Sequence, residues 1–218
     1  MAGAKGEVSV QEPTRAEATL LRRSAEARAT VPDLEMTADV DMSVASALPF
    51  AATTLLVRAC ALALREVPRA NGAYRDGHYE LYSRVNVGVA MFADEGPATP
   101  TVFDADAKTP AALEDELAEL GERARAGQLT PPELGGATFT LLDLGTFEIT
   151  AATPLPTPPH AAAIAAGQVR ERPAVKHGAI VPCAAMTLTL AADSRILYGA
   201  HAAGFLSRVR MHLEEPTA

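Results

Sequence analysis

Val85-Asn-Val-Gly-Val-Ala-Met91 is the stretch that decides the fold class, because its apolar side chains recur at every second position. That period is typical of a half-buried β-strand. Before it, residues 55–67 are apolar almost all round, as in a helix packed on both sides. After it, residues 111–126 place leucines on one face between Pro110 and Gly127, which predicts a second helix. Strands and helices share one chain, so we predict an α/β fold.

The segments on either side show the same helical and strand periods. Helices are expected over residues 14–29 and 200–213. Strands are expected over residues 36–41, 85–91 (ended by residues 94–97), 99–103, 138–144 and 187–190, with short ones around Ile164, Val169 and Ile180-Val181. Asn71-Gly72 and Asp76-Gly77 predict turns, and the Pro-rich residues 153–159 predict a rigid loop. No linker interrupts the pattern, so we expect a flexible N-terminus over residues 1–13 and one domain over residues 14–218.

Composition narrows the class of partner. With 218 residues, 48% of them hydrophobic, the chain is long enough to bury a sizeable core, and no run of eighteen apolar residues suggests a membrane span. The net charge is −8, from 19 Lys and Arg against 27 Asp and Glu. Neutralising a nucleic-acid backbone requires a basic surface, so nucleic acid is not an expected partner.

The cysteines bear on metal binding, and the first ten residues bear on the cellular location. Cys60 and Cys183 lie in apolar stretches with no ligand spacing around them, so buried free thiols and no metal site are expected. Residues 1–10 lack the apolar core of a secretory signal, so we expect a cytoplasmic protein.

Several segments are specific when they are taken together. They are, in order, residues 85–91, Gly127-Gln-Leu-Thr-Pro-Pro-Glu-Leu-Gly-Gly136, Thr138-Phe-Thr140 with Asp143-Leu-Gly145, Pro158-Pro159, and Asp193-Ser-Arg-Ile-Leu-Tyr-Gly-Ala200. In this order and spacing they resemble the catalytic domain of the dihydrolipoamide acyltransferases of 2-oxoacid dehydrogenase complexes, relatives of chloramphenicol acetyltransferase. The likeness runs from about residue 20 to residue 216.

The resemblance implies a two-layer α/β sandwich, with a mixed, mostly antiparallel sheet and helices on one face. It also implies a homotrimer with an active-site channel between subunits. Coenzyme A or an acyl-CoA would enter the channel from one end as co-substrate, and the acyl acceptor or donor from the other.

Four positions depart from the family pattern. The family signature D-H-R-x-x-x-G supplies a histidine base, usually with Asp or Asn before the Gly, and a serine on an earlier strand donates to the oxyanion. Here the histidine position is Ser194, the position before the glycine is Tyr198, and the serine position is Leu142, next to Asp143 where the family usually has Asn. A serine hydroxyl is no base near neutral pH and a leucine donates no hydrogen bond. The resemblance therefore implies a non-standard active site.

Side chains near these positions are candidates to replace the missing catalytic groups. Asp193 and Arg195 flank the vacant histidine position and either hold a turn at the trimer interface or bind substrate together with Tyr198 and Leu142. Ser194 either donates to a substrate or is a polar replacement after loss of activity. Thr140 lies two positions before Leu142, on the same strand face, and is the best substitute oxyanion donor.

Two histidines are candidate bases. His201 lies in the first turn of the last helix, which follows the vacant position, and we prefer it; the alternative is an exposed histidine at a helix start. His160 follows Pro158-Pro159 near the expected subunit contact, and its alternative role is an interface hydrogen bond. The other histidines are interpreted as surface residues: His78, His177 and His212.

Two functions of different classes remain open. The leading one is a free-standing acyltransferase that moves an acetyl or similar group between coenzyme A and a hydroxyl of a small-molecule or carrier-bound biosynthetic intermediate. No lipoyl or subunit-binding domain is expected, and so no lipoyl group on this chain. The alternative is a catalytically inactive structural homologue, because some 2-oxoacid dehydrogenase complexes contain a structural component that shows D-S-R in place of D-H-R.

Overall fold

One long strand organises the fold in the computed structural model of the protein, which describes residues 6–93, 96–176 and 178–216. This strand, β10 (Ala179–Asp193), pairs antiparallel with β1 (Asp33–Asp41), β8 (Ala162–Ala166) and β9 (Arg170–Lys176). The sequence pattern predicted separate strands around Ile180 and over residues 187–190. Both belong to this one continuous strand, so the prediction of two strands was wrong.

The sheet is mixed. Its strand order is β1-β10-β8-β7-β4-β5, with β6 (Thr101–Val102) added on β4 and β9 added on β10. β7 (Phe139–Asp143) runs parallel to both β4 (Val87–Ala93) and β8, and the other strand pairs are antiparallel. β5 (Gly96–Ala98) starts within the expected strand end at residues 94–97, of which residues 94–95 lie outside the described residues.

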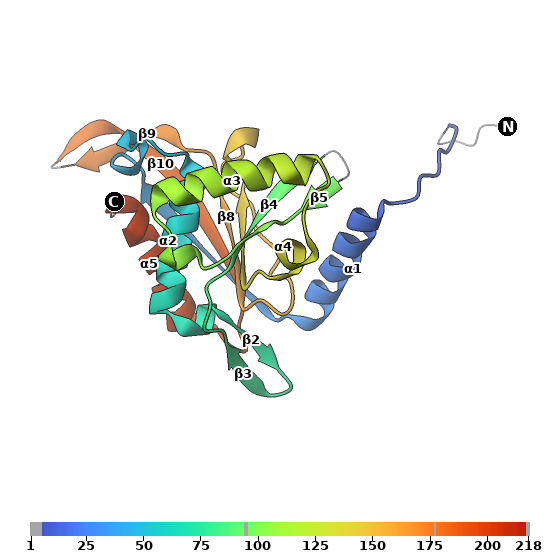
Figure 1. Ribbon diagram of the computed structural model, residues 1–218. Coiled ribbons are helices and arrows are strands. Elements are labelled where there is room, and N and C mark those ends of the chain that lie inside the picture. The colour runs from blue at the N-terminus through green and yellow to red at the C-terminus, as the bar shows by residue number, and fades with distance from the viewer. Residues whose placement is uncertain (1–5, 94–95, 177, 217–218) are drawn as a thin grey trace.

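Three helices cover one face of the sheet: α2 (Ala52–Glu66), α3 (Pro110–Arg125) and α5 (Gly199–Glu214) (Figure 1). Leu56 and Leu64 of α2 are buried, as expected for a helix packed on both sides. Phe139 of the sheet meets Phe205 of α5 edge to face, with ring centroids 5.5 Å apart. The predicted two-layer α/β sandwich with a mostly antiparallel mixed sheet is confirmed.

The opposite face of the sheet carries small and half-buried side chains. On β7, Leu141 points into the core, so Thr140 and Leu142 lie on the opposite face and are half-buried. The segment between β7 and β8 passes close to the sheet on that side. A Cβ atom on Gly167 would lie 1.9 Å from the carbonyl oxygen of Thr150, so only a glycine permits this approach.

Helix α1 (Arg15–Thr30) lies beside β5, at the edge of the sheet that this strand forms (Figure 1). A capping box starts it: Glu17 N donates to Thr14 Oγ1 at 3.2 Å and Thr14 N to Glu17 Oε2 at 2.7 Å. Of its apolar residues, Leu20 and Leu21 are 46% and 60% exposed. Residues 1–5 of the expected flexible N-terminus lie outside the described residues, and its flexibility stays a prediction.

A small hairpin at one end of the molecule was missed by the sequence patterns. It consists of β2 (Gly72–Arg75) and β3 (His78–Leu81), joined by the predicted Asp76-Gly77 turn, in which both residues have positive φ. The 3₁₀ turn η2 (Pro68–Ala70) leads into it. Its strands are short and largely polar, and apolar alternation is too weak a signal there. The short helix α4 (Pro131–Gly135) was missed as well.

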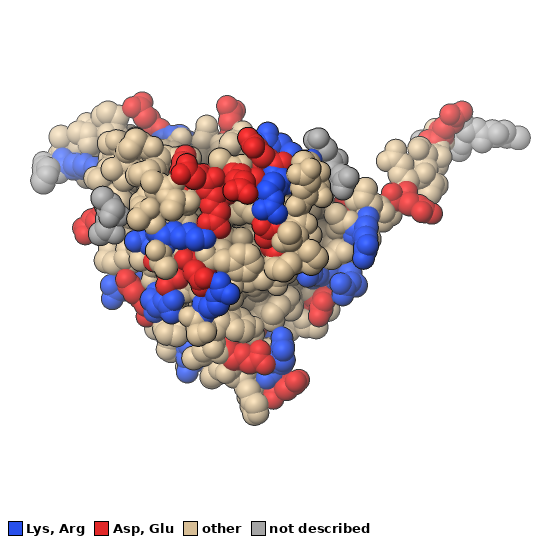
Figure 2. Space-filling view, in the orientation of Figure 1, with Lys and Arg blue, Asp and Glu red and all other residues tan. Residues whose placement is uncertain are grey.

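Both cysteines are free and buried, as predicted. Burial raises the pKa of the Cys60 thiol to about 12, so this sulfur stays protonated. Within the described ranges no helix is long and apolar enough to cross a bilayer. The face seen in Figure 2 intersperses Lys and Arg with Asp and Glu.

Candidate functional site

Two of the predicted site residues meet on the sheet face opposite the helices. Thr140 is presented by β7, and His160 stands at the end of the Pro-rich loop, just before β8. Thr140 Oγ1 and His160 Nδ1 lie 3.0 Å apart. The other ring nitrogen, Nε2, lies 2.8 Å from the carbonyl oxygen of Ala137.

These contacts fix the direction of both hydrogen bonds. A carbonyl oxygen only accepts, so His160 Nε2 carries the proton and donates it to Ala137. In the neutral ring Nδ1 then accepts, and the Thr140 hydroxyl donates to it. In this arrangement the one proton of the Thr140 hydroxyl is directed to His160, and the role of Thr140 as an oxyanion donor stays a prediction.

His160 is neutral at physiological pH. Burial lowers its pKa to about 4, outweighing the hydrogen bond to Ala137, and the charge of Arg23 on α1 acts in the same direction as burial. The ring is thus a hydrogen-bond acceptor for Thr140 over the whole neutral range.

Ser194 is engaged by the backbone. Its Oγ donates to the carbonyl oxygen of Pro32 at 2.7 Å, and its N–H donates to the same oxygen at 3.0 Å. The side chain joins the end of β10 to the start of β1. This geometry favours the replacement reading of Ser194 over a role as substrate donor.

Asp193 and Arg195 form a closed pair behind this turn. Asp193 is 4% exposed and accepts from Arg195 N, Nε and Nη2 at 2.6 to 3.2 Å. The guanidinium of Arg195 also lies over the ring of Tyr74, 4.8 Å from its centroid. These contacts tie the pair into the turn and favour the structural one of the two expected roles, and which role the pair has stays a prediction.

His201 and Tyr198 lie together at the start of α5. Tyr198 is the residue before the first helical turn and is 47% exposed. Its ring meets the exposed His201 ring edge to face, with centroids 4.9 Å apart. His201 has no contact with Thr140 or His160, so the structure divides the two candidate bases between separate places.

Leu142 and Asp143, two further predicted site residues, lie at the end of β7. Leu142 is half-buried on the same strand face as Thr140 and offers no polar atom. Asp143 accepts from Thr53 Oγ1 at 2.5 Å and from Gly145 N at 2.9 Å. Both bonds tie the end of β7 to its neighbours, and a catalytic role of Asp143 stays a prediction.

The histidines interpreted as surface residues have three different outcomes. His78 is exposed at the start of β3, as predicted. His212 is half-buried on α5, with Nε2 2.9 Å from Glu66 Oε1, so that prediction was wrong. His177 lies outside the described residues.

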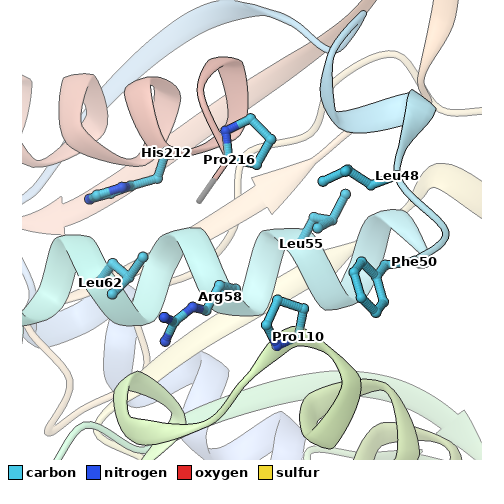
Figure 3. A pocket seen from close by; sticks show the side chains of 8 residues that line it. All are labelled: Leu48, Phe50, Leu55, Arg58, Leu62, Pro110, His212 and Pro216. Atoms are coloured by element: carbon cyan, nitrogen blue, oxygen red, sulfur yellow. The ribbon is translucent and has the colours of Figure 1, made fainter. Parts of the chain in front are cut away.

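A small pocket opens between α2, α5 and the start of α3 (Figure 3). Its lining is mainly apolar, with Leu55 and Phe50 beside Arg58 and His212. The cavity of about 30 Å³ has room for a water molecule and is too small for a substrate. None of the predicted site residues lines it. Within the described ranges, no three His, Cys, Asp or Glu side chains gather as metal ligands.

Comparison with known proteins agrees with the fold. The family described as 2-oxoacid dehydrogenases acyltransferase (catalytic domain) matches residues 12–218. A curated relative, the dihydrolipoyllysine-residue acetyltransferase component of the pyruvate dehydrogenase complex of Zymomonas mobilis, is 31% identical over 210 residues, 90% of this chain and 48% of the relative.

Solved structures give the same result. Dihydrolipoamide acetyltransferase of Azotobacter vinelandii has a TM-score of 0.92 at 27% identity, with 97% of this chain and 94% of that chain covered. The cubic core of a pyruvate dehydrogenase multienzyme complex gives the same values. Chloramphenicol acetyltransferase, at 15% identity and a TM-score of 0.58 over 88% of this chain and 94% of that one, shares the fold alone.

The sheet topology and the one-sided helix layer define an α/β domain of the chloramphenicol acetyltransferase type. Within that class, the chain belongs to the family of 2-oxoacid dehydrogenase acyltransferase catalytic domains, as its motifs implied. It spans about half the length of the curated relatives it matches, 48% for the first two.

Proposed function

We propose that the chain is an acyltransferase that moves an acetyl or similar group between coenzyme A and a hydroxyl of a small-molecule or carrier-bound acceptor, in cytoplasmic biosynthesis. Family membership supports acyl transfer, and relatives in the family bear the names of acetyl- and succinyltransferases. One observation carries the proposal for this chain: the Thr140 hydroxyl donates to an imidazole whose far nitrogen is fixed on a carbonyl. A hydroxyl, a base and a group that orients the base are the parts of an activated proton-transfer unit.

The pair of Thr140 and His160 supplies the proton transfer that Ser194 cannot perform. The acceptor hydroxyl gives its proton to Thr140 Oγ1 while the Thr140 proton passes to His160 Nδ1. The acceptor oxygen bonds to the thioester carbonyl carbon, the carbon–sulfur bond breaks, and the departing thiolate takes the proton back. The products are the acyl ester and free coenzyme A, and both residues return to their starting states.

Burial limits the strength of His160 as a base. With a pKa of about 4, His160 takes up a proton less readily than an ordinary imidazole. Holding donor and acceptor together in a water-free channel has to supply the larger part of the rate. We therefore expect slow turnover.

The channel requires more than one copy of the chain, and we include a homotrimer in the proposal. Large apolar side chains lie uncovered on α1 and at the tip of the β9–β10 hairpin; Leu20, Leu21, Val175 and Ile180 are between 46% and 79% exposed. Val175 and Ile180 are cross-strand partners. Exposed apolar side chains that lie side by side favour association. Light scattering after gel filtration at micromolar concentration should give three times the mass of one chain, and a stable monomer would overturn the trimer.

Binding of the donor tests the activity. Acetyl-CoA should bind by calorimetry and raise the melting temperature, because a ligand that prefers the native state stabilises it. Free thiol should appear from acetyl-CoA when a panel of hydroxyl acceptors is added. A trimer with no heat of binding and no thermal shift at millimolar acetyl-CoA would overturn the proposal.

A second function is favoured by one observation of its own. The hydroxyl of Ser194, at the vacant histidine position, donates its proton to the carbonyl oxygen of Pro32, and the side chain of Leu142 has no polar atom. In the Azotobacter vinelandii enzyme, the catalytic roles of a serine, a histidine and an asparagine were investigated. An inactive structural homologue of such an acyltransferase fits the loss of these groups, and it predicts a trimer that does not bind acetyl-CoA.

A further inference from the structure

Arg69 lies between two tyrosine rings, and in the described part of the chain no acidic group or other acceptor pairs with its charge. Its guanidinium carbon lies 4.8 Å from the centroid of Tyr79 and 5.9 Å from that of Tyr198. Among residues 6–93, 96–176 and 178–216 its side chain makes neither a hydrogen bond nor an ion pair, and Nη1 is buried without a partner. The charge of Arg69 therefore has no partner among these residues.

Two other arginines show that this state is unusual. Arg58 and Arg172 also have a buried nitrogen without a partner, in each case Nε. Arg58 nevertheless donates to the carbonyl oxygen of Asp106 at 2.9 Å, and Arg172 donates to Asp39 Oδ1 at 2.9 Å. Of these three arginines, only Arg69 has no hydrogen-bond partner among the described residues on any nitrogen of its guanidinium, and its Nε and Nη2 are not among the buried unpartnered atoms.

The position of Arg69 is fixed by its neighbours. The next residue, Ala70, is fully buried, and Asn71 is 2% exposed and donates to the carbonyl oxygens of Tyr82 and Arg84 at 3.0 and 2.9 Å. η2 also packs against α5 and against the β2–β3 hairpin. The guanidinium is thus supported before any ligand arrives, which lowers the entropy cost of binding.

The surrounding charges leave this spot positive. The neighbouring guanidinium of Arg195 lies over Tyr74 and is neutralised by Asp193. Tyr198 is the N-cap of α5, whose first turn carries no acidic residue and no side-chain cap, so the positive end of the helix dipole lies there. Tyr79 and Tyr198 are each 47% exposed, and Arg69 is half-buried, so solvent reaches the cluster.

We propose that Arg69, flanked by the rings of Tyr79 and Tyr198, binds an oxyanion of the ligand. This oxyanion is either a phosphate or a carboxylate. A planar guanidinium binds such groups through two parallel hydrogen bonds, and the aromatic faces keep it oriented. The inference rests on the proposed function in one respect: it takes the ligand to be an acyl-transfer substrate. The oxyanion is then either a phosphate of coenzyme A or a carboxylate of the acyl group or acceptor.

Tyrosine fluorescence reports on this cluster directly. The chain has four tyrosines and no tryptophan, and Tyr74, Tyr79 and Tyr198 all belong to the cluster. Pyrophosphate and succinate do not absorb at the excitation wavelength and are the probes. We expect a saturable change with at least one of them at constant ionic strength. Preference for pyrophosphate identifies the phosphates of coenzyme A, and preference for succinate identifies a carboxylate.

Variants assign the signal to Arg69. Arg69→Gln should weaken binding of the preferred probe at least tenfold, while Arg75→Gln, at the end of β2 and paired with Glu80 at 3.6 Å, should leave it unchanged. Arg69→Lys keeps the charge but loses the fork, and it should weaken binding several-fold even if Arg69→Gln does not fold. The inference is overturned by the absence of a saturable change with both probes at 10 mM, or by equal affinities of wild type and Arg69→Lys.

Failure of this inference is distinguishable from failure of the proposed function. Pyrophosphate or succinate binding through Arg69 without turnover of acetyl-CoA would overturn the acyl transfer and leave the oxyanion site. Turnover of acetyl-CoA with the same KM in wild type and Arg69→Gln, and no probe binding, would overturn the site and leave the acyl transfer.

Discussion

The Thr140 hydroxyl lies 3.0 Å from Nδ1 of His160, and this contact joins β7 to the end of the Pro-rich loop across 20 residues of sequence. Both groups were expected near the site, yet in separate roles. The carbonyl of Ala137 on the far side of the ring determines which nitrogen carries the proton. The site therefore depends on a neutral His160.

A neutral, half-buried histidine makes stability depend on pH. The folded-state pKa of His160 is about 4, below the 6.5 of a free imidazole, so between pH 6.5 and 4 the unfolded chain binds more protons than the folded one. The free energy of unfolding should therefore fall as the pH drops through that window, by at most about 1.4 kcal/mol per pH unit from this group. Urea unfolding at pH 7, 6, 5 and 4.5 measures the slope.

His160→Gln isolates the contribution of this group, because glutamine keeps a donor for Ala137 and an acceptor for Thr140 but does not titrate. The variant should show a shallower slope than wild type between pH 6.5 and 4. His78→Gln, at an exposed position, should follow wild type. Equal slopes for wild type and His160→Gln would mean that the ring is protonated without difficulty in the folded state.

The Thr140 hydroxyl can be removed with little change of shape. Thr140→Val leaves His160 Nδ1 without its donor and should lower the free energy of unfolding by about 1 kcal/mol. If the proton passes through Thr140, acyl transfer should fall on the order of a hundredfold, and kcat should fall more than KM rises. Thr140→Ser, which retains the hydroxyl, should restore both. Loss of stability with unchanged kcat would leave Thr140 a purely structural residue.

Much of the fold could be predicted because its core elements follow one period each. The α2 helix, with Leu56 and Leu64, and the strand around Val87 are apolar where they meet the core, so burial and periodicity agree. The site was harder to predict. Thr140 and His160 meet only because β7 and the loop before β8 are neighbours in space, and a sequence does not give that contact. Arg69 was missed because its partners are the faces of Tyr79 and Tyr198, which have no fixed spacing from it.

The pair of Asp193 and Arg195 should contribute to stability more than an exposed pair does. Asp193 is 4% exposed and accepts several hydrogen bonds from Arg195, so Asp193→Ala leaves these donors without their acceptor. We expect a loss of roughly 2 kcal/mol, below the usual figure for a buried pair because Arg195 is partly exposed. Urea unfolding at pH 7 measures it. Glu80→Ala, which breaks the exposed pair with Arg75, should cost less than about 0.5 kcal/mol. Similar losses for the two variants would contradict a stabilising role of the buried turn.

Two glycines should respond in opposite directions to the same added methyl group. In Gly167→Ala the new Cβ would lie 1.9 Å from the carbonyl oxygen of Thr150, and since both are backbone-bound, the loop that carries His160 must move. We expect a loss of more than about 2 kcal/mol, as for other overpacked sites, together with a His160 pKa that rises toward 6.5 as the ring becomes hydrated. Gly121→Ala, inside α3 with no atom within 4 Å of the new Cβ, should stabilise by roughly 0.5 to 1 kcal/mol. Urea unfolding gives both stabilities, and NMR titration of the His160 ring gives the pKa. A Gly167→Ala protein as stable as wild type, with the His160 pKa still near 4, would show that the loop moves freely without disturbing the pair with Thr140.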